Sequence, residues 1–163
     1  MIGSTKYSTV IGIGQLVKLP AFTRAALKAL QDVPYTQQGT GFQIGDTIFE
    51  SALEALYFHR FGKIDLDKDG NLDYIISRLF NIPVVHMVFS AEERYWDAKV
   101  FLSVDPKLVI VGSYTGPADE FKGSLPVNIK PAQRKQLQQL VRRMAKLKVT
   151  GKVAFHAYHL FGG

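Results

Sequence analysis

Several residue types and motifs are missing from this chain of 163 residues, and each absence removes a class of function. There is no cysteine, which excludes disulfide bonds, thiolate metal sites and cysteine nucleophiles. No apolar run approaches the roughly 20 residues of a membrane-spanning helix. The sequence also lacks the G-x-S-x-G motif of many hydrolases and the H-E-x-x-H motif of zinc proteases. The redox compartment stays open, because proteins without cysteine occur on both sides of a membrane.

Acidic residues are absent from residues 121–163, which carry 9 basic residues. Residues 1–120 have 11 basic and 14 acidic residues, and half of those acids fall within residues 46–73. The net charge of +6 therefore hides an acidic middle and a basic end. Such polarity suggests an anionic partner for the C-terminal part, or head-to-tail contact between like subunits.

The length and the hydrophobic content of 47% suit one globular domain, residues 1–163, with a substantial core. There are no repeats, no low-complexity tracts and no sign of a domain boundary. Residues 8–17 are mildly apolar, but Lys18 and Arg24 follow closely and no small-residue cleavage site is present. This segment is a poor signal peptide.

Local patterns predict helices before strands in the first two thirds of the chain. Residues 20–31 have proline in the first turn of a helix-promoting run, and residues 47–50 (Thr-Ile-Phe-Glu) match a capping box that would begin a second helix. Residues 82–89, 95–104 and 107–114 each have strand character. These three should pair in sequence as an antiparallel meander.

Residues 131–148 are the best helix candidate, ended by Gly151, and residues 153–161 alternate as a final strand does. At 100° per residue one stripe of this helix is apolar. Its members are Leu137, Leu140, Val141, Met144 and Leu147. The predicted fold class is therefore α+β: an antiparallel β-meander packed by a C-terminal amphipathic helix, with two N-terminal helices.

Residues 65–73, Asp-Leu-Asp-Lys-Asp-Gly-Asn-Leu-Asp, have the spacing of a loop that surrounds a hard divalent cation. Ca²⁺ takes six to eight oxygen ligands from carboxylates, carbonyls and water, and Gly70 allows the sharp turn. Without a cation, four carboxylates within nine residues would repel one another, and Lys68 offsets only part of that charge. The predicted side-chain ligands are Asp65, Asp67, Asp69 and Asp73, with the carbonyl group of Asn71.

The pattern D-x-D-x-D-G-x-x-D resembles the calcium loop of integrin-type FG-GAP repeats and the first nine positions of an EF-hand. Apolar residues precede it at the spacing of an entering EF-hand helix: Tyr57, Phe61 and Ile64. However, Ile76 stands at the twelfth position, where an EF-hand has a bidentate glutamate. Residues 74–77 favour a strand, which is the FG-GAP context. The resemblance covers about twenty residues and implies a calcium ion, not a whole-protein function.

The face opposite the apolar stripe of residues 131–148 is basic and has no acidic residue to form i,i+4 pairs. Such a face binds phosphates or anionic lipid headgroups, or receives an acidic protein surface. It lacks interleaved aromatic residues, so a reader of single-stranded nucleic acid is not favoured. A simple solvated surface is the alternative. The predicted partner-binding residues are Lys135, Arg142, Arg143 and Lys146.

Three other motifs are weaker. Gly12-Ile-Gly14 lacks the third glycine of a dinucleotide fingerprint, since Val17 follows, and is interpreted as a turn. His156 and His159 would point to opposite faces of a strand and could not share a metal ion there. Glu92, Glu93 and Asp97 are more typical of a charged hairpin turn than of a pair of catalytic carboxylates.

These features together predict a calcium-stabilised binding or structural module that engages a protein partner, or itself, through its basic helix. A loop without the bidentate glutamate should bind calcium weakly, as extracellular modules do, so an extracellular or periplasmic location is expected. Two alternatives stay open. One is a cytoplasmic module whose helix binds nucleic acid or an anionic membrane. The other is a hydrolytic enzyme built from residues 95–97 and the terminal histidines.

Overall fold

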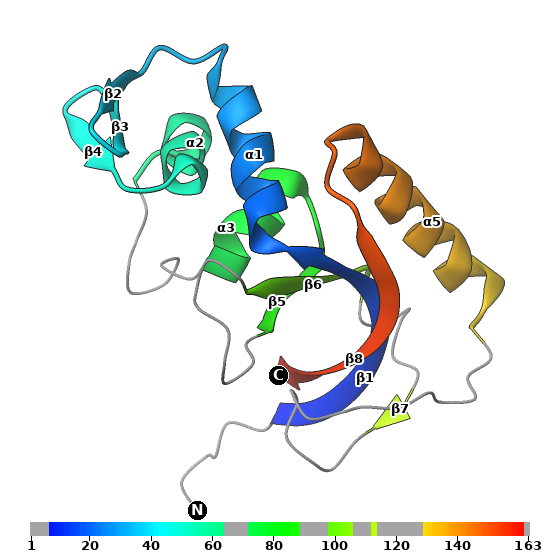
Figure 1. The fold of residues 1–163 in the computed structure, drawn as a ribbon. Helices are drawn as coiled ribbons and strands as arrows, with labels where there is room; N and C mark the ends of the chain where they lie inside the picture. Colours follow the sequence, from blue (N-terminus) through cyan, green and yellow to red (C-terminus); the bar gives the residue numbers. More distant parts are fainter. Residues whose placement is uncertain (1–6, 64–71, 89–97, 106–111, 114–128, 162–163) are drawn as a thin grey trace, which may run out of the picture.

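A computed structural model of the chain describes residues 7–63, 72–88, 98–105, 112–113 and 129–161 (Figure 1). The described elements follow in this order: β1 (Tyr7–Lys18), α1 (Leu19–Leu30), β2 (Thr36–Gln38), β3 (Gly41–Ile44), β4 (Thr47–Phe49), α2 (Ala52–Phe61), α3 (Leu72–Phe80), β5 (Val84–Val88), β6 (Lys99–Ser103), β7 (Gly112–Ser113), α5 (Pro131–Lys146) and β8 (Gly151–Phe161). Helices and antiparallel sheets occur together, so the α+β class is confirmed.

Strand β1 is the centre of the larger sheet. One of its edges pairs with β6, from Gly14↔Ser103 to Lys18↔Lys99, and further along with β7. The other edge pairs with β8 over eleven residues, and β5 extends the sheet beyond β6. The smaller sheet, β2-β3-β4, lies on the opposite side of the molecule from α5 (Figure 1).

The two faces of β1 enter different clusters of buried side chains. Ile13 and Val17 join the main core, to which all four described helices contribute. Val10, on the other face, packs with Phe101 of β6 and Tyr158 of β8 in a second cluster. Because both faces are covered, residues 10–15 are all buried. Such a strand has a nearly continuous apolar sequence in place of an alternating one.

The predicted layout of the fold is wrong, although its class is right. The C-terminal element is the strand β8, and the first element is the strand β1, so α5 is not terminal and the helices lie within the chain. The sheet is not a meander either. β5 and β6 pair as expected. Of the predicted strand 107–114 only β7 is described, and this part pairs with β1; residues 107–111 and 114 lie outside the described residues. Long-range pairing with β1 separates strands that are consecutive in sequence.

Two predictions of local secondary structure are also wrong. Residues 47–50 do not begin a helix, because Thr47–Phe49 is β4. The second helix begins at Ala52, and the Ser51 hydroxyl accepts a hydrogen bond from the Glu54 N–H at 3.1 Å. Residues 74–77 are helical and lie within α3, where the inward-facing Ile75 and Ile76 are buried. Burial of one helical face outweighs the strand preference of these residues.

Helix α5 is confirmed with slightly shorter bounds, and its apolar stripe is largely correct. Leu137, Leu140 and Met144 are buried in the main core. Leu147 is 43% exposed, so its predicted place in the stripe is wrong. The helix ends at Lys146, and the Leu147 and Val149 N–H groups both donate to the Met144 carbonyl oxygen. Leu147 therefore belongs to the cap and not to the packed face.

The Gly12-Ile-Gly14 motif lies in β1 and is not a turn. A Cβ atom on Gly12 would be 2.7 Å from the ring of Tyr158, and one on Gly14 would be 2.7 Å from the ring of Phe101. The glycines therefore provide the space that these two aromatic rings occupy on the sheet. A Cβ atom on Gly14 would also clash with the Leu102 carbonyl oxygen of the neighbouring strand, so Gly14 allows the close approach of β6 as well.

Candidate functional site

The predicted calcium loop joins α2 to α3. Asp65, Asp67, Asp69 and Asn71 lie outside the described residues, and only Asp73 is placed. Asp73 is half-buried in the first turn of α3, and its Oδ1 atom accepts a hydrogen bond from the Tyr74 N–H at 3.0 Å. In the described part of the chain, no group of three or more His, Cys, Asp or Glu side chains could hold a metal ion.

Contacts between α2 and α3 hold the two ends of this loop together. Arg78 of α3 donates a hydrogen bond to the hydroxyl group of Tyr57 at 2.9 Å, and its guanidinium group lies 4.3 Å from the centre of the Phe61 ring. Arg60 of α2 donates to the Leu79 carbonyl oxygen at 3.4 Å. These groups form an interhelical clamp, so the loop leaves one helix and enters the next at a fixed separation.

Ile76 is completely buried, so the residue at the twelfth loop position is part of the core. No carboxylate replaces the missing bidentate ligand there. The two flanking helices give the loop the helix-loop-helix context of an EF-hand, in place of the strand that the sequence predicted.

The predicted partner-binding residues lie together on the exposed face of α5. Lys135, Arg142, Arg143 and Lys146 are all exposed. Arg143 also has an intramolecular contact, since its Nη2 atom donates to the Asn81 carbonyl oxygen at 2.7 Å. Among the described residues, the other three side chains make no hydrogen bond and no ion pair. We call these four residues the α5 basic face.

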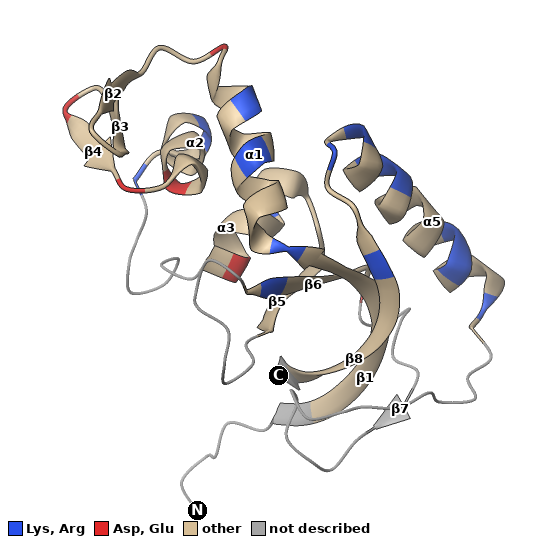
Figure 2. Cartoon of the chain, viewed as in Figure 1, with Lys and Arg blue, Asp and Glu red and all other residues tan. Residues whose placement is uncertain are grey.

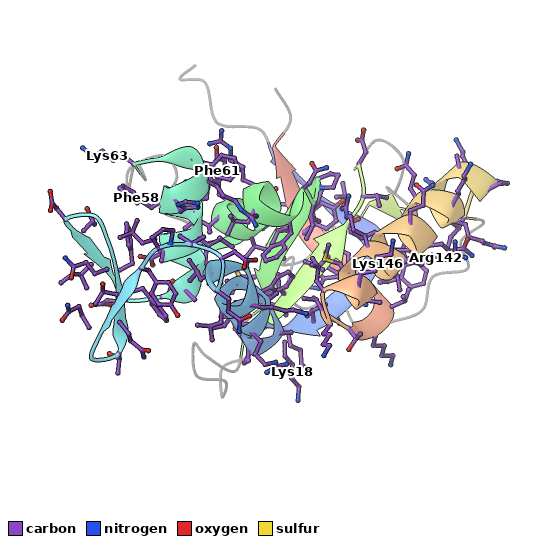
Figure 3. The ribbon with its side chains drawn as sticks, turned by 90° about the horizontal axis from the view of Figure 1, so that it is seen from above. Lys18, Phe58, Phe61, Lys63, Arg142 and Lys146 are labelled. Atoms are coloured by element: carbon purple, nitrogen blue, oxygen red, sulfur yellow. The ribbon has the colours of Figure 1, made fainter. Side chains whose placement is uncertain are left out.

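Acidic residues are placed unevenly, although basic residues occur on both sides of the molecule, including α1 and the end of α2 (Figure 2). Basic residues follow α5, whereas most described acidic residues lie near β4, α2 and the start of α3 (Figure 2). Figure 3 shows that the part of α5 with Arg142 and Lys146 is far from the end of α2, which is marked there by Lys63. We call the region around Asp46, Glu50, Glu54 and Asp73 the acidic end. Asp46 and Glu50 are its exposed members.

A pocket of about 530 Å³ lies between the N-terminal parts of α1 and α2 at the acidic end. Arg24, Glu50 and Glu54 contribute its charged groups, and Leu19, Leu53 and Leu72 are among its apolar ones. Burial, followed by the neighbouring carboxylate of Glu50, raises the pKa of Glu54 above its ordinary value. The pocket therefore favours the neutral form of one carboxyl group.

The two terminal histidines lie on opposite faces of β8, as predicted. His159 is exposed and its Nδ1 atom is 3.1 Å from the Thr9 hydroxyl group, whereas His156 is buried. The sequence did not reveal that His156 contacts His86 of β5, with His86 Nδ1 2.9 Å from His156 Nε2. Seventy residues separate the two in sequence, so no local motif could show the pair.

Tyr158 lies two residues further along β8, and burial, then the charge of Asp105, raises its pKa to about 12. Its hydroxyl group is buried and has no hydrogen-bond partner in the described part of the chain. Residues 95–97 of the enzyme alternative lie outside the described residues, as do Glu92 and Glu93 of the predicted charged turn.

The sequence analysis did not identify a second group of basic residues, which lie close together in the fold. Five of them, Lys18, Arg24, Lys99, Lys148 and Lys152, line one pocket of about 360 Å³. They come from β1, α1, β6, the turn after α5, and β8. Since these segments are far apart in sequence, only the fold brings the charges together.

None of the helices in the described ranges is both long and apolar enough to cross a membrane. In comparisons with known proteins, no family model matches the sequence, and no curated protein and no solved structure matches it with significance.

Proposed function

We propose that this chain is a calcium-stabilised assembly module in which the α5 basic face binds the acidic end of a second copy. The observation that supports this most is that α5 carries basic residues and no acidic residue, whereas most described acidic residues lie on the other side of the molecule (Figure 2). Complementary patches steer association and fix its register, and their attraction is weakened by salt. A surface that binds a different surface on an identical copy gives a head-to-tail interface.

The absence of nearby acids on α5 also supports the proposal. Within the described ranges, Lys135, Arg142 and Lys146 have no carboxylate partner, so association would not first break an internal ion pair. At the other side, Asp46 and Glu50 are exposed and available to a neighbouring molecule. A head-to-tail contact repeats unless it closes a ring, so oligomers larger than a dimer are expected at high concentration.

Sedimentation velocity at low and high salt tests the assembly. We expect salt-sensitive self-association that is lost in Arg142→Glu with Lys146→Glu, and also in Asp46→Lys with Glu50→Lys. Mixing the two double variants should restore association, because each then presents the charge that the other lacks. Lys28→Glu, a charge reversal at an exposed position of α1, serves as the control. A monomer at every salt concentration would refute the proposal. Binding of the monomer to DNA or to anionic vesicles would favour the alternative partners.

The calcium part of the proposal rests on the interhelical clamp. Arg78, Tyr57 and Phe61 set the separation of the loop ends without an ion, so less order has to be created when calcium binds. Asp65, Asp67, Asp69, Asp73 and the Asn71 carbonyl group would hold the ion. With Ile76 at the twelfth position, affinity should be weak, of the order of 10⁻⁴–10⁻³ M, which suits an extracellular or periplasmic protein.

Calorimetry and thermal unfolding test whether the loop binds calcium. We expect one dominant calcium site, with weaker binding of Mg²⁺, whose octahedral shell accepts fewer protein oxygens. Because calcium would bind only the folded state, the melting temperature should rise with calcium and fall with chelator. Asp67→Asn with Asp69→Asn should abolish this response, whereas Asp32→Asn, outside the loop, should retain it. An unchanged melting temperature and no heat at millimolar calcium would refute the site.

A further inference from the structure

The pocket of about 360 Å³ has a composition that is unusual for a solvated surface. Five cations line it, and none of its described lining residues is acidic. In the described part of the chain, none of the five side chains makes a hydrogen bond or an ion pair. Convergent charges of one sign repel one another, so a group of unpaired cations around a concave surface indicates a place for an anion.

The register of the sheet increases this repulsion. Lys18 of β1 lies directly opposite Lys99 of β6, and like charges at directly opposed positions destabilise an antiparallel pair. Lys152 of β8 approaches from the other edge of β1, where it is paired with Leu16. The sheet itself therefore holds three of the cations around one end of β1. Lys18 projects from the body of the molecule at this end (Figure 3).

The first turn of α1 contributes a second, independent feature. Lys18 is the N-cap residue of this helix of 12 residues, and no side chain caps it and no acidic residue lies in its first turn. The Leu19 N–H donates to the Ala98 carbonyl oxygen. Lys18 and Ala21 both line the pocket, so the positive end of the helix dipole adds to the lysine charges. Because the Leu19 N–H is already bonded and Pro20 has no N–H, the helix contributes its dipole here and not a row of free backbone donors.

The turn after α5 supplies one more of the cations, Lys148, and α1 supplies the fifth, Arg24. Lys148 has φ of +59°, a left-handed conformation that glycine or asparagine usually adopts at the end of a helix. A lysine there costs of the order of 1 kcal/mol in backbone strain. The conformation turns the chain so that Lys148, Thr150 and Lys152 all line the pocket. The Thr150 hydroxyl group is a further donor for an anion.

We propose that this pocket binds a small molecule carrying two or more linked phosphate groups. Arg24 also lines the pocket that contains Glu50 and Glu54, so four of the cations line this pocket alone. A single phosphate dianion would neutralise only half of these four charges, whereas a pyrophosphate group approaches their sum. The volume lies at the lower end of the range for small-molecule sites. Among the apolar lining residues, Leu16 is half-buried and offers a contact to the organic part of the ligand, whereas Val17 and Ala21 are buried in the main core.

The lining also separates this ligand from nucleic acid. None of the described lining residues is aromatic, so there is no platform on which successive bases could stack. The inference does not depend on the assembly proposed above, because none of the five cations belongs to the α5 basic face. Charge reversal on α5 should leave the pocket intact.

Titration calorimetry of the full chain with inorganic pyrophosphate, in calcium-free buffer, tests the inference. We expect a single site, with inorganic phosphate and sulfate binding at least tenfold more weakly. Lys99→Gln with Lys152→Gln should weaken pyrophosphate binding at least tenfold. The matched control, Lys28→Gln with Lys63→Gln, removes the same charge outside the pocket and should bind as the parent does.

Thermal unfolding of both double variants checks that they are folded. If Lys99→Gln with Lys152→Gln fails to fold, Lys148→Gln provides the test, because this exposed side chain lies in a turn and outside the sheet. The inference is overturned if pyrophosphate gives no heat, or if the control variant loses affinity as strongly as the pocket variant. It is also overturned if a single-stranded oligonucleotide displaces pyrophosphate at lower concentration than a nucleoside diphosphate does.

Discussion

The imidazole rings of His86 and His156 contact each other across the larger sheet, with Nδ1 of the first 2.9 Å from Nε2 of the second. They belong to β5 and β8, which are separated by β6 and β1. Three strand spacings in a flat sheet would be about 14 Å. The contact therefore requires a strongly curved sheet, which is visible in the path of β1 and β8 (Figure 1). Phe101 supports the pair, with its ring centre 5.0 Å from that of His156.

A double-mutant cycle should detect this contact. One imidazole donates to the other, so His86→Ala and His156→Ala should show a coupling energy of about 0.5–1.5 kcal/mol in urea unfolding. The control cycle combines His86→Ala with His159→Ala, since His159 lies on the other face of β8. That cycle should be additive. Additivity in the first cycle as well would show that the ring contact contributes nothing to stability.

Removing the hydroxyl group of Tyr158 should not destabilise the fold. The group is buried without a partner in the described residues, and an unsatisfied polar atom of this kind costs roughly 1–3 kcal/mol. We expect Tyr158→Phe to raise the free energy of unfolding by about 1 kcal/mol. Tyr57→Phe is the matched control, because it deletes the hydrogen bond from Arg78 and should lower stability by about 1 kcal/mol. Equal losses in both variants would contradict this account.

The ionised side chain of Glu54 should make the protein less stable at neutral pH than a neutral side chain of the same shape would. Burial, and then Glu50, raise its pKa above the ordinary value of 4.5. A carboxyl group with a raised folded-state pKa contributes stability below its unfolded pKa, and this is lost as the pH rises through the folded-state pKa. Glu54→Gln should therefore stabilise the protein at pH 7, by about 0.5 kcal/mol after solvent screening, and the gain should vanish below about pH 4.

Urea unfolding of the parent and of Glu54→Gln at several pH values provides this measurement. Ser51 continues to cap α2 in the variant, because the cap uses the backbone N–H of residue 54. A loss of stability at pH 7 would mean that the helix dipole favours the Glu54 charge more strongly than burial opposes it.

Local signals predicted α1 and α5 well, since a helix with one buried face shows its period in the sequence. They missed β1, because a strand covered on both faces has no alternation; residues 10–15 are all buried. The start of α2 was placed four residues early, at the Thr47 capping pattern, although Ser51 and Glu54 have the same spacing. Either pattern fits a cap, and only the pairing of β3 with β4 decides between them.

The exposed face of a single helix could be predicted from the sequence, whereas clusters built from several segments could not. The α5 basic face lies on one helix, and its four residues are exposed as expected. Lys18 and Lys99 lie 81 positions apart and meet only because β1 pairs with β6. The contact of His86 with His156 likewise depends on the curvature of the sheet. Strand order and curvature are set by long-range pairing, about which periodicity carries no information.

The packing of α5 on the sheet gives a final expectation about stability. Leu140 is 2% exposed and belongs to the main core, whereas Leu147, about two helical turns further on, is 43% exposed. Leu140→Ala should therefore leave a cavity and cost about 2–5 kcal/mol. Leu147→Ala should cost clearly less, about 1 kcal/mol or below, since little of its surface is removed from water.

Urea unfolding of these two single variants compares the same chemical change at two positions of the same segment. Because the α5 basic face depends on the docking of this helix, Leu140→Ala should also weaken the salt-sensitive self-association, whereas Leu147→Ala should not. Similar losses of stability in both variants would mean that the helix is not held by the stripe of Leu137, Leu140 and Met144. Its basic face would then have no fixed position relative to the acidic end.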